Sequence, residues 1–271
     1  MRQFILEKQP SSDGLVHIIG KDYRYLRQVL RVKNGDMLSL RLPDGSLKNS
    51  TVAFVDENAK KITLQLCADS GFEDKSITRG VQANQIQTLF DKNEYWLFQF
   101  IPRPQKFEQI VRQATECGIT NIVPIIGEYC EKISLTSFSE NKLSRLEKII
   151  KEARQQSGSP VQTKIFEPMS LEQAIDLWNK ETVEGTNLGF VLSERDENSP
   201  KLSQIVSSSS GLKKICIAIG NEGGISPAEV ELLKTKGLFY PLHFSVNILR
   251  CETAALYGIA AIQSTIQDFV L

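Results

Sequence analysis

The sequence predicts an α/β protein with two domains, a small β-rich domain followed by a larger domain built on a parallel sheet. From about residue 93 onward, strand and helix patterns alternate, which is typical of a parallel sheet with helices on both faces. Residues 1–70 instead contain several short strand patterns and one helix. The chain has 271 residues, which is long enough for two modest domains.

The N-terminal domain is predicted to contain one helix, over residues 20–36. Leu26, Val29 and Leu30 share one side of this helix at helical spacing. Strands are predicted over 36–46, 50–58 and 60–67, separated by Asp-Gly and Glu-Asn turns. Such a domain could close into a small barrel. Residues 71–92 are mostly polar without a clear period, and we expect a linker there that leads into the second domain.

The second domain, residues 93–271, is predicted to alternate strands with amphipathic helices. The expected strands are 95–101, 119–126, 162–166, 187–194, 213–220 and 238–244. The expected helices are 105–118, 142–158, 170–180, 226–237 and 253–269. Ligands of open parallel sheets bind at the carboxyl ends of the strands, so the loops after the strands are the places to look for a site.

The first unusual loop is GNEGG, residues 220–224. Its three glycines permit positive φ angles and close approach of the backbone to a ligand. Ser226, Pro227 and Glu229 supply a complete helix start, so the helix is capped by its own serine and a phosphate cradle is disfavoured. The spacing matches neither GxGxxG nor the Walker A loop. A plain tight turn is the alternative interpretation.

The second unusual loop is SVNILRCETAA, residues 245–255. It crowds Asn247, Arg250, Glu252 and Thr253 between a strand and a helix rich in small residues. Because Ile248 and Leu249 flank Arg250, we expect that arginine to be half buried and to need a carboxylate partner. Either Glu222 or Glu252 could supply it, and a purely structural salt bridge is the competing interpretation.

Metal and membrane chemistry are not indicated. The five cysteines are scattered and only two histidines occur, so a zinc site is not expected and the thiols are expected to be reduced core residues. No apolar run reaches the length of a transmembrane helix, and the N-terminus does not have the pattern of a signal peptide. We therefore expect a cytoplasmic protein.

Charge is distributed unevenly although the net charge is zero. Residues 1–70 hold 11 Lys and Arg against 8 Asp and Glu, whereas the rest of the chain carries a small negative excess. Within the predicted helix, four cations fall at helical spacing opposite the apolar side: Lys21, Arg24, Arg27 and Arg31. Such a row can bind a phosphate backbone. A solvated helix face is the alternative.

Taken together, the two loops make the sequence recognisable. IGNEGGISPAE followed by NILRCETAA resembles the ribosomal RNA small subunit methyltransferase E family, whose hallmark is GPEGG…ILRxETA. This family belongs to the SPOUT superfamily. MRQFIL, HIIGKDYRYLRQVLRVKNGD, QKFEQIVRQATECGITNIVPI and KIIKEARQQSG also resemble family segments in the family's order, so the resemblance covers nearly the whole chain.

The resemblance implies an N-terminal PUA-like RNA-binding β-barrel and a C-terminal SPOUT parallel sheet with a deep trefoil knot. It also implies a homodimer that uses S-adenosylmethionine, without a metal, and releases S-adenosylhomocysteine. The implied reaction is methylation of N3 of a conserved uridine in the decoding region of 16S rRNA, within the assembled 30S subunit.

Site residues follow from the same resemblance. The methyl donor is expected to contact Leu192, Gly220, Asn221, Glu222, Gly223, Gly224, Ile248, Leu249, Glu252 and Thr253. Removal of the N3 proton of uracil leaves an anion spread over two oxygens, and a positive group aimed at that charge lowers the barrier. We expect Arg250 to supply it, with Glu222 or Glu252 orienting the arginine or relaying the proton.

Three positions depart from the family pattern. Asn221 replaces the proline of GPEGG, and two arginines of the family are replaced by Asn247 and Ser159. The loss of two basic residues affects the expected RNA substrate more than the expected donor. Two alternatives therefore stay open: an enzyme of the same fold that acts on a different RNA site, and a ribosome assembly factor without catalytic activity.

Overall fold

The computed structural model describes residues 3–67, 93–132, 134, 140–183, 185–193, 199–209 and 211–270. These residues divide into two compact units. The N-terminal unit holds residues 3–67, and the C-terminal unit holds the residues from Asn93 onward apart from 155–158, which group with the first unit. The linker predicted over 71–92 lies outside the described residues.

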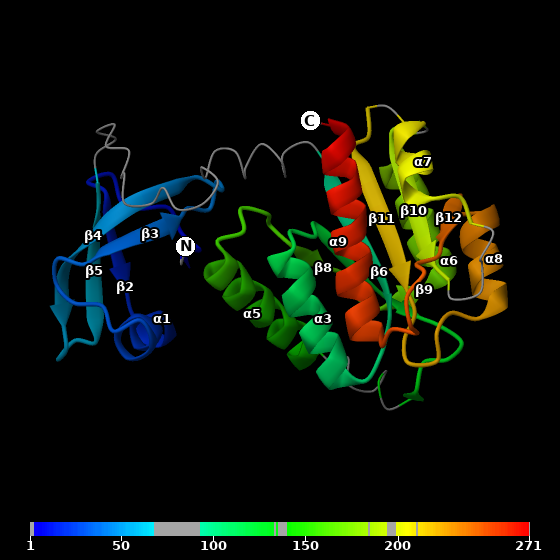
Figure 1. The fold of residues 1–271 in the computed structure, drawn as a ribbon. Helices are drawn as coiled ribbons and strands as arrows, with labels where there is room; N and C mark the ends of the chain where they lie inside the picture. The colour runs from blue at the N-terminus through cyan, green and yellow to red at the C-terminus, as the bar shows by residue number, and fades with distance from the viewer. Residues whose placement is uncertain are drawn as a thin grey trace. The chain divides into compact units, whose positions relative to one another are not determined.

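A five-stranded curled sheet forms the N-terminal unit (Figure 1), in the order β1-β3-β4-β5-β2. Its strands are β1 (Gln3–Ile5), β2 (Leu15–Ile18), β3 (Met37–Arg41), β4 (Leu47–Asp56) and β5 (Lys61–Leu66). All its pairings are antiparallel except β1 with β3. The curl fits the barrel expected from the sequence.

The predicted helix of this unit is shorter and less regular than expected. It begins as α1 (Gly20–Arg24) and continues as a π-helical turn, η1 (Tyr25–Val29), in which the amide of Leu30 bonds to the carbonyl of Tyr25. The wider turn rotates later side chains away from the α-helical pattern. Leu26 is therefore fully buried, whereas Val29, predicted on the same apolar side, is 60% exposed.

The C-terminal unit contains the predicted parallel sheet, in the order β12-β10-β11-β6-β7-β8, with β9 also paired to β7. All strand pairings described in this unit are parallel. The strands are β6 (Glu94–Phe100), β7 (Asn121–Ile126), β8 (Lys164–Ile165), β9 (Met169–Ser170), β10 (Asn187–Leu192), β11 (Lys214–Ile219) and β12 (Phe239–Leu242).

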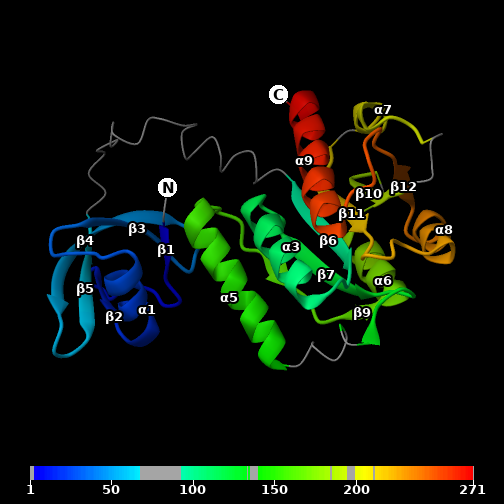
Figure 2. The same cartoon turned by 60° about the horizontal axis from the view of Figure 1, so that its bottom comes forward.

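Helices cover both faces of this sheet, as Figure 2 shows from a second direction. On one face lie α3 (Pro104–Glu116), α5 (Glu140–Ser157), α7 (Leu202–Ser207) and α9 (Cys251–Val270). On the other lie α6 (Leu171–Glu181) and α8 (Pro227–Thr235). Successive side chains of a strand point to opposite faces of the sheet. Leu97 packs against the helices of the first face, whereas Trp96 and Phe98 pack against those of the second.

The small residues of α9 let that helix approach the sheet closely. A Cβ atom on Gly258 would lie 2.5 Å from Ile217 Cδ1, so any larger residue would force the Ile217 side chain to move. Ala254 and Ala255 are buried in the same interface. These contacts place the first turn of α9 directly beside the ends of the central strands.

Candidate functional site

A cavity of about 450 Å³ lies where β10, β11 and β12 end. Because β10 pairs with both β11 and β12, the loops that follow the outer two strands meet above the end of the middle one. The cavity is lined by Tyr129, Leu192, Ser193, Ile219, Gly220, Asn221, Gly223, Gly224, Ile225, Pro227, Val230, Leu249, Cys251 and Ala254. The two loops singled out in the sequence therefore form one site.

The glycine loop is a tight turn that needs its glycines. A Cβ atom on Gly220 would lie 2.6 Å from the carbonyl carbon of Gly224, which is closer than any real contact. Gly224 itself has φ +82°, a left-handed conformation that glycine adopts without strain. The amide of Gly224 bonds to the carbonyl of Asn221 at 3.0 Å and closes the turn.

Asn221 stabilises this turn where the family has proline. Its Oδ1 accepts a hydrogen bond from the amide of Gly223 at 2.8 Å, an Asx arrangement that mimics a backbone turn. Its Nδ2 lies 3.7 Å from Cys130 Sγ, and the side chain is only 7% exposed. The loop is thus held by hydrogen bonds instead of by a restricted φ angle.

A buried glutamine ties the loop to the centre of the sheet. Gln99, at the end of β6, is fully buried, and its Nε2 donates to the carbonyl of Gly220 at 3.1 Å. The same nitrogen lies 2.9 Å from the carbonyl of Phe100 and 3.3 Å from that of Ile219. Nothing in the local sequence pattern distinguishes this residue, because Ile219 and Gly220 are far from it along the chain.

The lining favours an uncharged ring system over a phosphate. No charged side chain lines the cavity among the residues that the structure describes. Helix α8 is capped by Ser226, whose Oγ accepts from the amide of Glu229, as the sequence predicted. Apolar walls with a few backbone donors and acceptors are typical of sites for small organic ligands.

A second, polar cavity of about 320 Å³ adjoins the first. The two share five lining residues, Asn221, Gly223, Gly224, Leu249 and Cys251. The second cavity adds the charged side chains of Lys106, Glu222 and Arg250, together with Ile248. A group bound in one cavity would therefore face a group bound in the other across the glycine loop.

Lys106, in the first turn of α3, joins the two carboxylates of this region. Its Nζ lies 3.4 Å from Glu222 Oε1 and 3.5 Å from Glu252 Oε2. Glu222 Oε1 also accepts a hydrogen bond from the backbone amide of Arg103 at 3.2 Å. The sequence reasoning did not select Lys106, because it lies far from both loops along the chain.

These contacts shift the pKa values of Glu252 and Lys106. Burial alone would raise the pKa of Glu252, but hydrogen bonds from its own backbone amide and from Cys251, with the charge of Lys106, hold that pKa below its ordinary value. Partial burial would lower the pKa of Lys106, yet the negative groups around it, Glu222 and Glu252 among them, raise it. Both residues are therefore charged at neutral pH.

Arg250 does not adopt the predicted position. It is exposed, and no ion pair joins it to a carboxylate within the described part of the chain. The expectation failed because Ile248 is 80% exposed and does not cover the arginine. Lys106 instead forms ion pairs with Glu222 and Glu252, the two carboxylates that we expected Arg250 to bind.

Cys251 is buried next to this cluster, in surroundings that disfavour its thiolate form. Burial, together with the hydrogen bond from its thiol to Glu252 at 3.3 Å, raises its pKa to about 12. Cys216 is buried as expected, but Cys67 is exposed, which corrects the expectation that all the thiols are core residues. Within the described segments, no three His, Cys, Asp or Glu side chains are grouped as a metal site.

The predicted donor contacts divide into three groups. Leu192, Gly220, Asn221, Gly223, Gly224 and Leu249 line the first cavity. Glu222 and Ile248 line only the second. Glu252 and Thr253 line neither and lie in the first turn of α9, where Thr253 is exposed.

The four cations predicted to bind RNA do not form one row. Lys21 and Arg24 are exposed on α1. Arg27 is drawn into an ion pair with Glu57 and donates to the carbonyl of Val32 at 2.9 Å. Arg31 lies beyond the helix, with φ +56°. The π-helical turn and the early helix end are the reasons for the difference.

Comparisons with known proteins support the methyltransferase resemblance. A family model described as an RNA methyltransferase domain matches residues 91–263. Ribosomal RNA small subunit methyltransferase E 2 of Borreliella burgdorferi is 27% identical over 274 residues, 99% of each chain. Ribosomal RNA small subunit methyltransferase E of Rickettsia conorii is 27% identical over 253 residues, 93% of this chain and 88% of the relative.

A solved structure shares the fold. The crystal structure of a ribosomal RNA small subunit methyltransferase E from Neisseria gonorrhoeae, bound to S-adenosyl methionine, matches with a TM-score of 0.75. The match covers 97% of each chain at 23% identity. No helix in the described ranges is both long and apolar enough to span a membrane.

Proposed function

Because the chain belongs to the RNA methyltransferase family, we propose that it methylates N3 of a uridine in the decoding region of 16S rRNA, with S-adenosylmethionine as the donor. The relatives named above carry the ribosomal substrate in their names. The observation that carries the proposal is the pair of adjoining cavities, one uncharged and one charged, that share the glycine loop as their common wall.

The uncharged cavity is the proposed donor site. Its volume and apolar walls suit an adenosine group, and the glycines of the loop let a ring approach the backbone closely. When bound, the donor supplies an electrophilic methyl group on a positively charged sulfur. We propose that Glu222, which lines the adjoining cavity, and Glu252, which shares Lys106 with it, favour that positive charge. We propose Ile248 and Thr253 as further contacts.

The charged cavity is the proposed seat of the target base. Uracil N3 must lose its proton before it can accept a methyl group, and the negative charge then spreads over the two flanking carbonyl oxygens. We propose that Arg250 and Lys106 stabilise this charge, because both cations line the cavity. Glu222 or Glu252 would accept the proton. Lys106 also keeps the two carboxylates together, which makes it a positioning residue for both.

The finer features of the family complete the proposal. They are a deep trefoil knot around the donor site, a PUA-like N-terminal unit that binds RNA, and a homodimer that acts in the cytoplasm on the assembled 30S subunit. The exposure of Ile248, with Val246 at 45% and Tyr257 at 42%, fits a second subunit that covers this region. Lys21, Arg24, Arg27 and Arg31 are proposed RNA contacts.

One structural observation favours a second candidate function, that of an enzyme of the same fold that acts on a different RNA site. Asn247 is exposed and directly precedes Ile248 of the charged cavity in the chain, at a position where the family has an arginine, so one cation that would meet the substrate is absent. Ser159, which stands where the family has its other arginine, is buried and supplies no positive charge. An assembly factor without activity is disfavoured, because both cavities retain their polar groups.

Two experiments test the proposal. Isothermal titration calorimetry with S-adenosylmethionine should show binding, and its absence would favour the assembly factor. Mass spectrometry of 16S rRNA from a deletion strain should show loss of N3-methyluridine, restored by the cloned gene. Undiminished N3-methyluridine in a strain without a second such enzyme would exclude this substrate. A missing methyl group elsewhere in the RNA would identify the second candidate as correct.

A further inference from the structure

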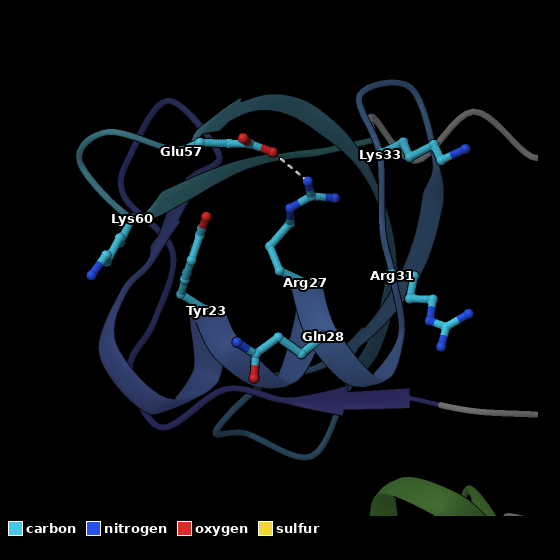
Figure 3. Close-up of a pocket in the computed structure, with 7 residues that line it drawn as sticks. All are labelled: Tyr23, Arg27, Gln28, Arg31, Lys33, Glu57 and Lys60. Atoms are coloured by element: carbon cyan, nitrogen blue, oxygen red, sulfur yellow. Dashed lines mark hydrogen bonds and ion pairs between the residues drawn. The ribbon is translucent and has the colours of Figure 1, made fainter.

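A basic hollow of about 640 Å³ lies on the N-terminal unit (Figure 3). It is lined by Tyr23, Arg27, Gln28, Arg31, Lys33, Glu57 and Lys60. Four of these seven residues are cations and only one is a carboxylate, in a chain whose net charge is zero. The sequence predicted Arg27 and Arg31 as RNA contacts but not Lys33 and Lys60. Lys33 lies in the turn before β3, and Lys60 lies in the turn after β4.

The single carboxylate of the hollow is already paired with a cation of the same hollow. Glu57 forms an ion pair with Arg27, which also donates to the carbonyl of Val32 (Figure 3). Arg27 is therefore fixed as part of the floor. No ion pair joins Arg31, Lys33 or Lys60 to a carboxylate within the described ranges, so these three cations are available to an anion from outside.

Two of these cations belong to residues with an unusual backbone conformation. Arg31 has φ +56° and Lys60 has φ +49°, both in the left-handed region that residues with a side chain seldom adopt. Only one other non-glycine residue of the described chain, Leu238, has a positive φ. In Figure 3, Arg31 and Lys33 lie at one end of the hollow and Lys60 at the other, with Tyr23 and Arg27 between them.

We infer that this hollow binds an unpaired nucleotide of the RNA substrate, an inference that rests on the proposed function. Arg31, Lys33 and Lys60 would bind the phosphates that flank the nucleotide. The ring of Tyr23 and the amide of Gln28 would meet its base, as aromatic and amide side chains do in single-stranded RNA recognition. The backbone of double-stranded RNA would instead favour a row of cations on a convex surface. Lys21 and Arg24, which could belong to such a row, do not line the hollow.

Fluorescence anisotropy of the full chain, with a short labelled single-stranded RNA at several salt concentrations, tests this inference. The variant Lys33→Gln/Lys60→Gln should bind about tenfold more weakly, and its log–log salt slope should fall by about 1.4, or 0.7 for each lost phosphate contact. Tyr23→Leu should weaken binding without changing the slope, because stacking releases no counterions. The same strand annealed into a duplex should bind more weakly than the single strand.

Matched variants decide between the hollow and a diffuse basic face. Lys21→Gln/Arg24→Gln removes the same charge from the α1 contacts proposed above and should weaken binding by about threefold, which is less than the loss expected for the hollow variant. Lys8→Gln, an exposed position outside the hollow, serves as the single-charge control. Equal losses for the two double variants would overturn the inference. So would a harmless Tyr23→Leu together with full displacement of the RNA by inorganic polyphosphate, which would reduce the hollow to a phosphate site.

A separate readout keeps this test independent of the proposed function. The hollow variants should keep the wild-type affinity for S-adenosylmethionine in calorimetry, because the donor cavity belongs to the C-terminal unit. A wild-type chain that binds RNA through the hollow but transfers no methyl group would contradict the proposed function and leave the nucleotide site standing.

Discussion

The ammonium nitrogen of Lys106 lies 3.4 Å from Oε1 of Glu222, which joins the first turn of α3 to the loop that follows β11. The same nitrogen lies 3.5 Å from Oε2 of Glu252 on α9. One cation thus joins a carboxylate of the glycine loop, which lines the charged cavity, to a carboxylate in the first turn of α9. Without it, the carboxylates would face each other with no positive charge between them.

Lys106→Met should therefore impair methyl transfer more than it impairs folding. We expect a loss of about 100-fold in single-turnover rate, because a cation near the developing charge is removed and the carboxylates repel each other. Lys106→Arg should restore part of the rate, since it keeps the charge. A Lys106→Met protein with a wild-type rate and wild-type affinity for S-adenosylmethionine would show that the pair is only a surface contact.

Gly220→Ala should weaken donor binding by about tenfold, equivalent to about 1.4 kcal/mol. The added methyl group would lie 2.6 Å from the backbone of Gly224, so the turn must open. Calorimetry with S-adenosylmethionine measures the effect. Gly211→Ala is a matched control, because Gly211 has φ +66° with no atom near the added methyl group. It should cost about 1 kcal/mol of stability and leave donor affinity unchanged.

The strands, most helices and the position of the glycine loop could be predicted because their signals are local. Glycine spacing, the Ser226 cap and the alternation of apolar residues each depend on a few neighbours along the chain, and the structure confirms them. Lys106 and Gln99 could not be found in this way. Their importance comes from partners on other strands and loops, which become neighbours only after the sheet has formed.

The basic residues show a different limit of sequence reasoning. A regular α-helix would place Arg27 and Arg31 in one row with Lys21, but the chain forms a π-helical turn and then enters a left-handed residue. The fully buried Leu26 fixes that turn against the barrel core, which is a tertiary effect. Helical periodicity therefore predicted correctly that this segment carries basic side chains. It predicted wrongly that they form one row.

Asn221→Ala should destabilise the glycine loop, because the amide of Gly223 loses its side-chain acceptor in a nearly buried position. We expect a loss of about 1 kcal/mol in unfolding free energy and weaker binding of S-adenosylmethionine. Asn221→Ser keeps a shorter acceptor and should lose less. Urea unfolding and calorimetry measure both effects. Equal behaviour of the two variants would show that the hydrogen bond to Gly223 does not rigidify the loop.

Glu108 should make stability depend on pH through its contacts between α3 and α5. Its carboxylate lies 2.7 Å from Lys142 Nζ and 2.8 Å from a guanidinium nitrogen of Arg145. Burial alone would raise the pKa of Glu108, but these two cations lower it below the ordinary value. A carboxyl group with a lowered folded pKa stabilises the protein above its unfolded pKa, and this contribution is lost as the pH falls through the folded pKa.

Glu108→Gln should therefore cost about 1 kcal/mol at neutral pH and progressively less below the ordinary glutamate pKa of about 4.3. Urea unfolding followed by tryptophan fluorescence reports on the C-terminal unit, because both tryptophans, Trp96 and Trp178, belong to it. Glu147→Gln, an exposed change on α5, is the control and should have little effect at any pH. A Glu108→Gln deficit of the same size in acid as at neutral pH would show that lost packing, and not the ion pairs, causes the destabilisation.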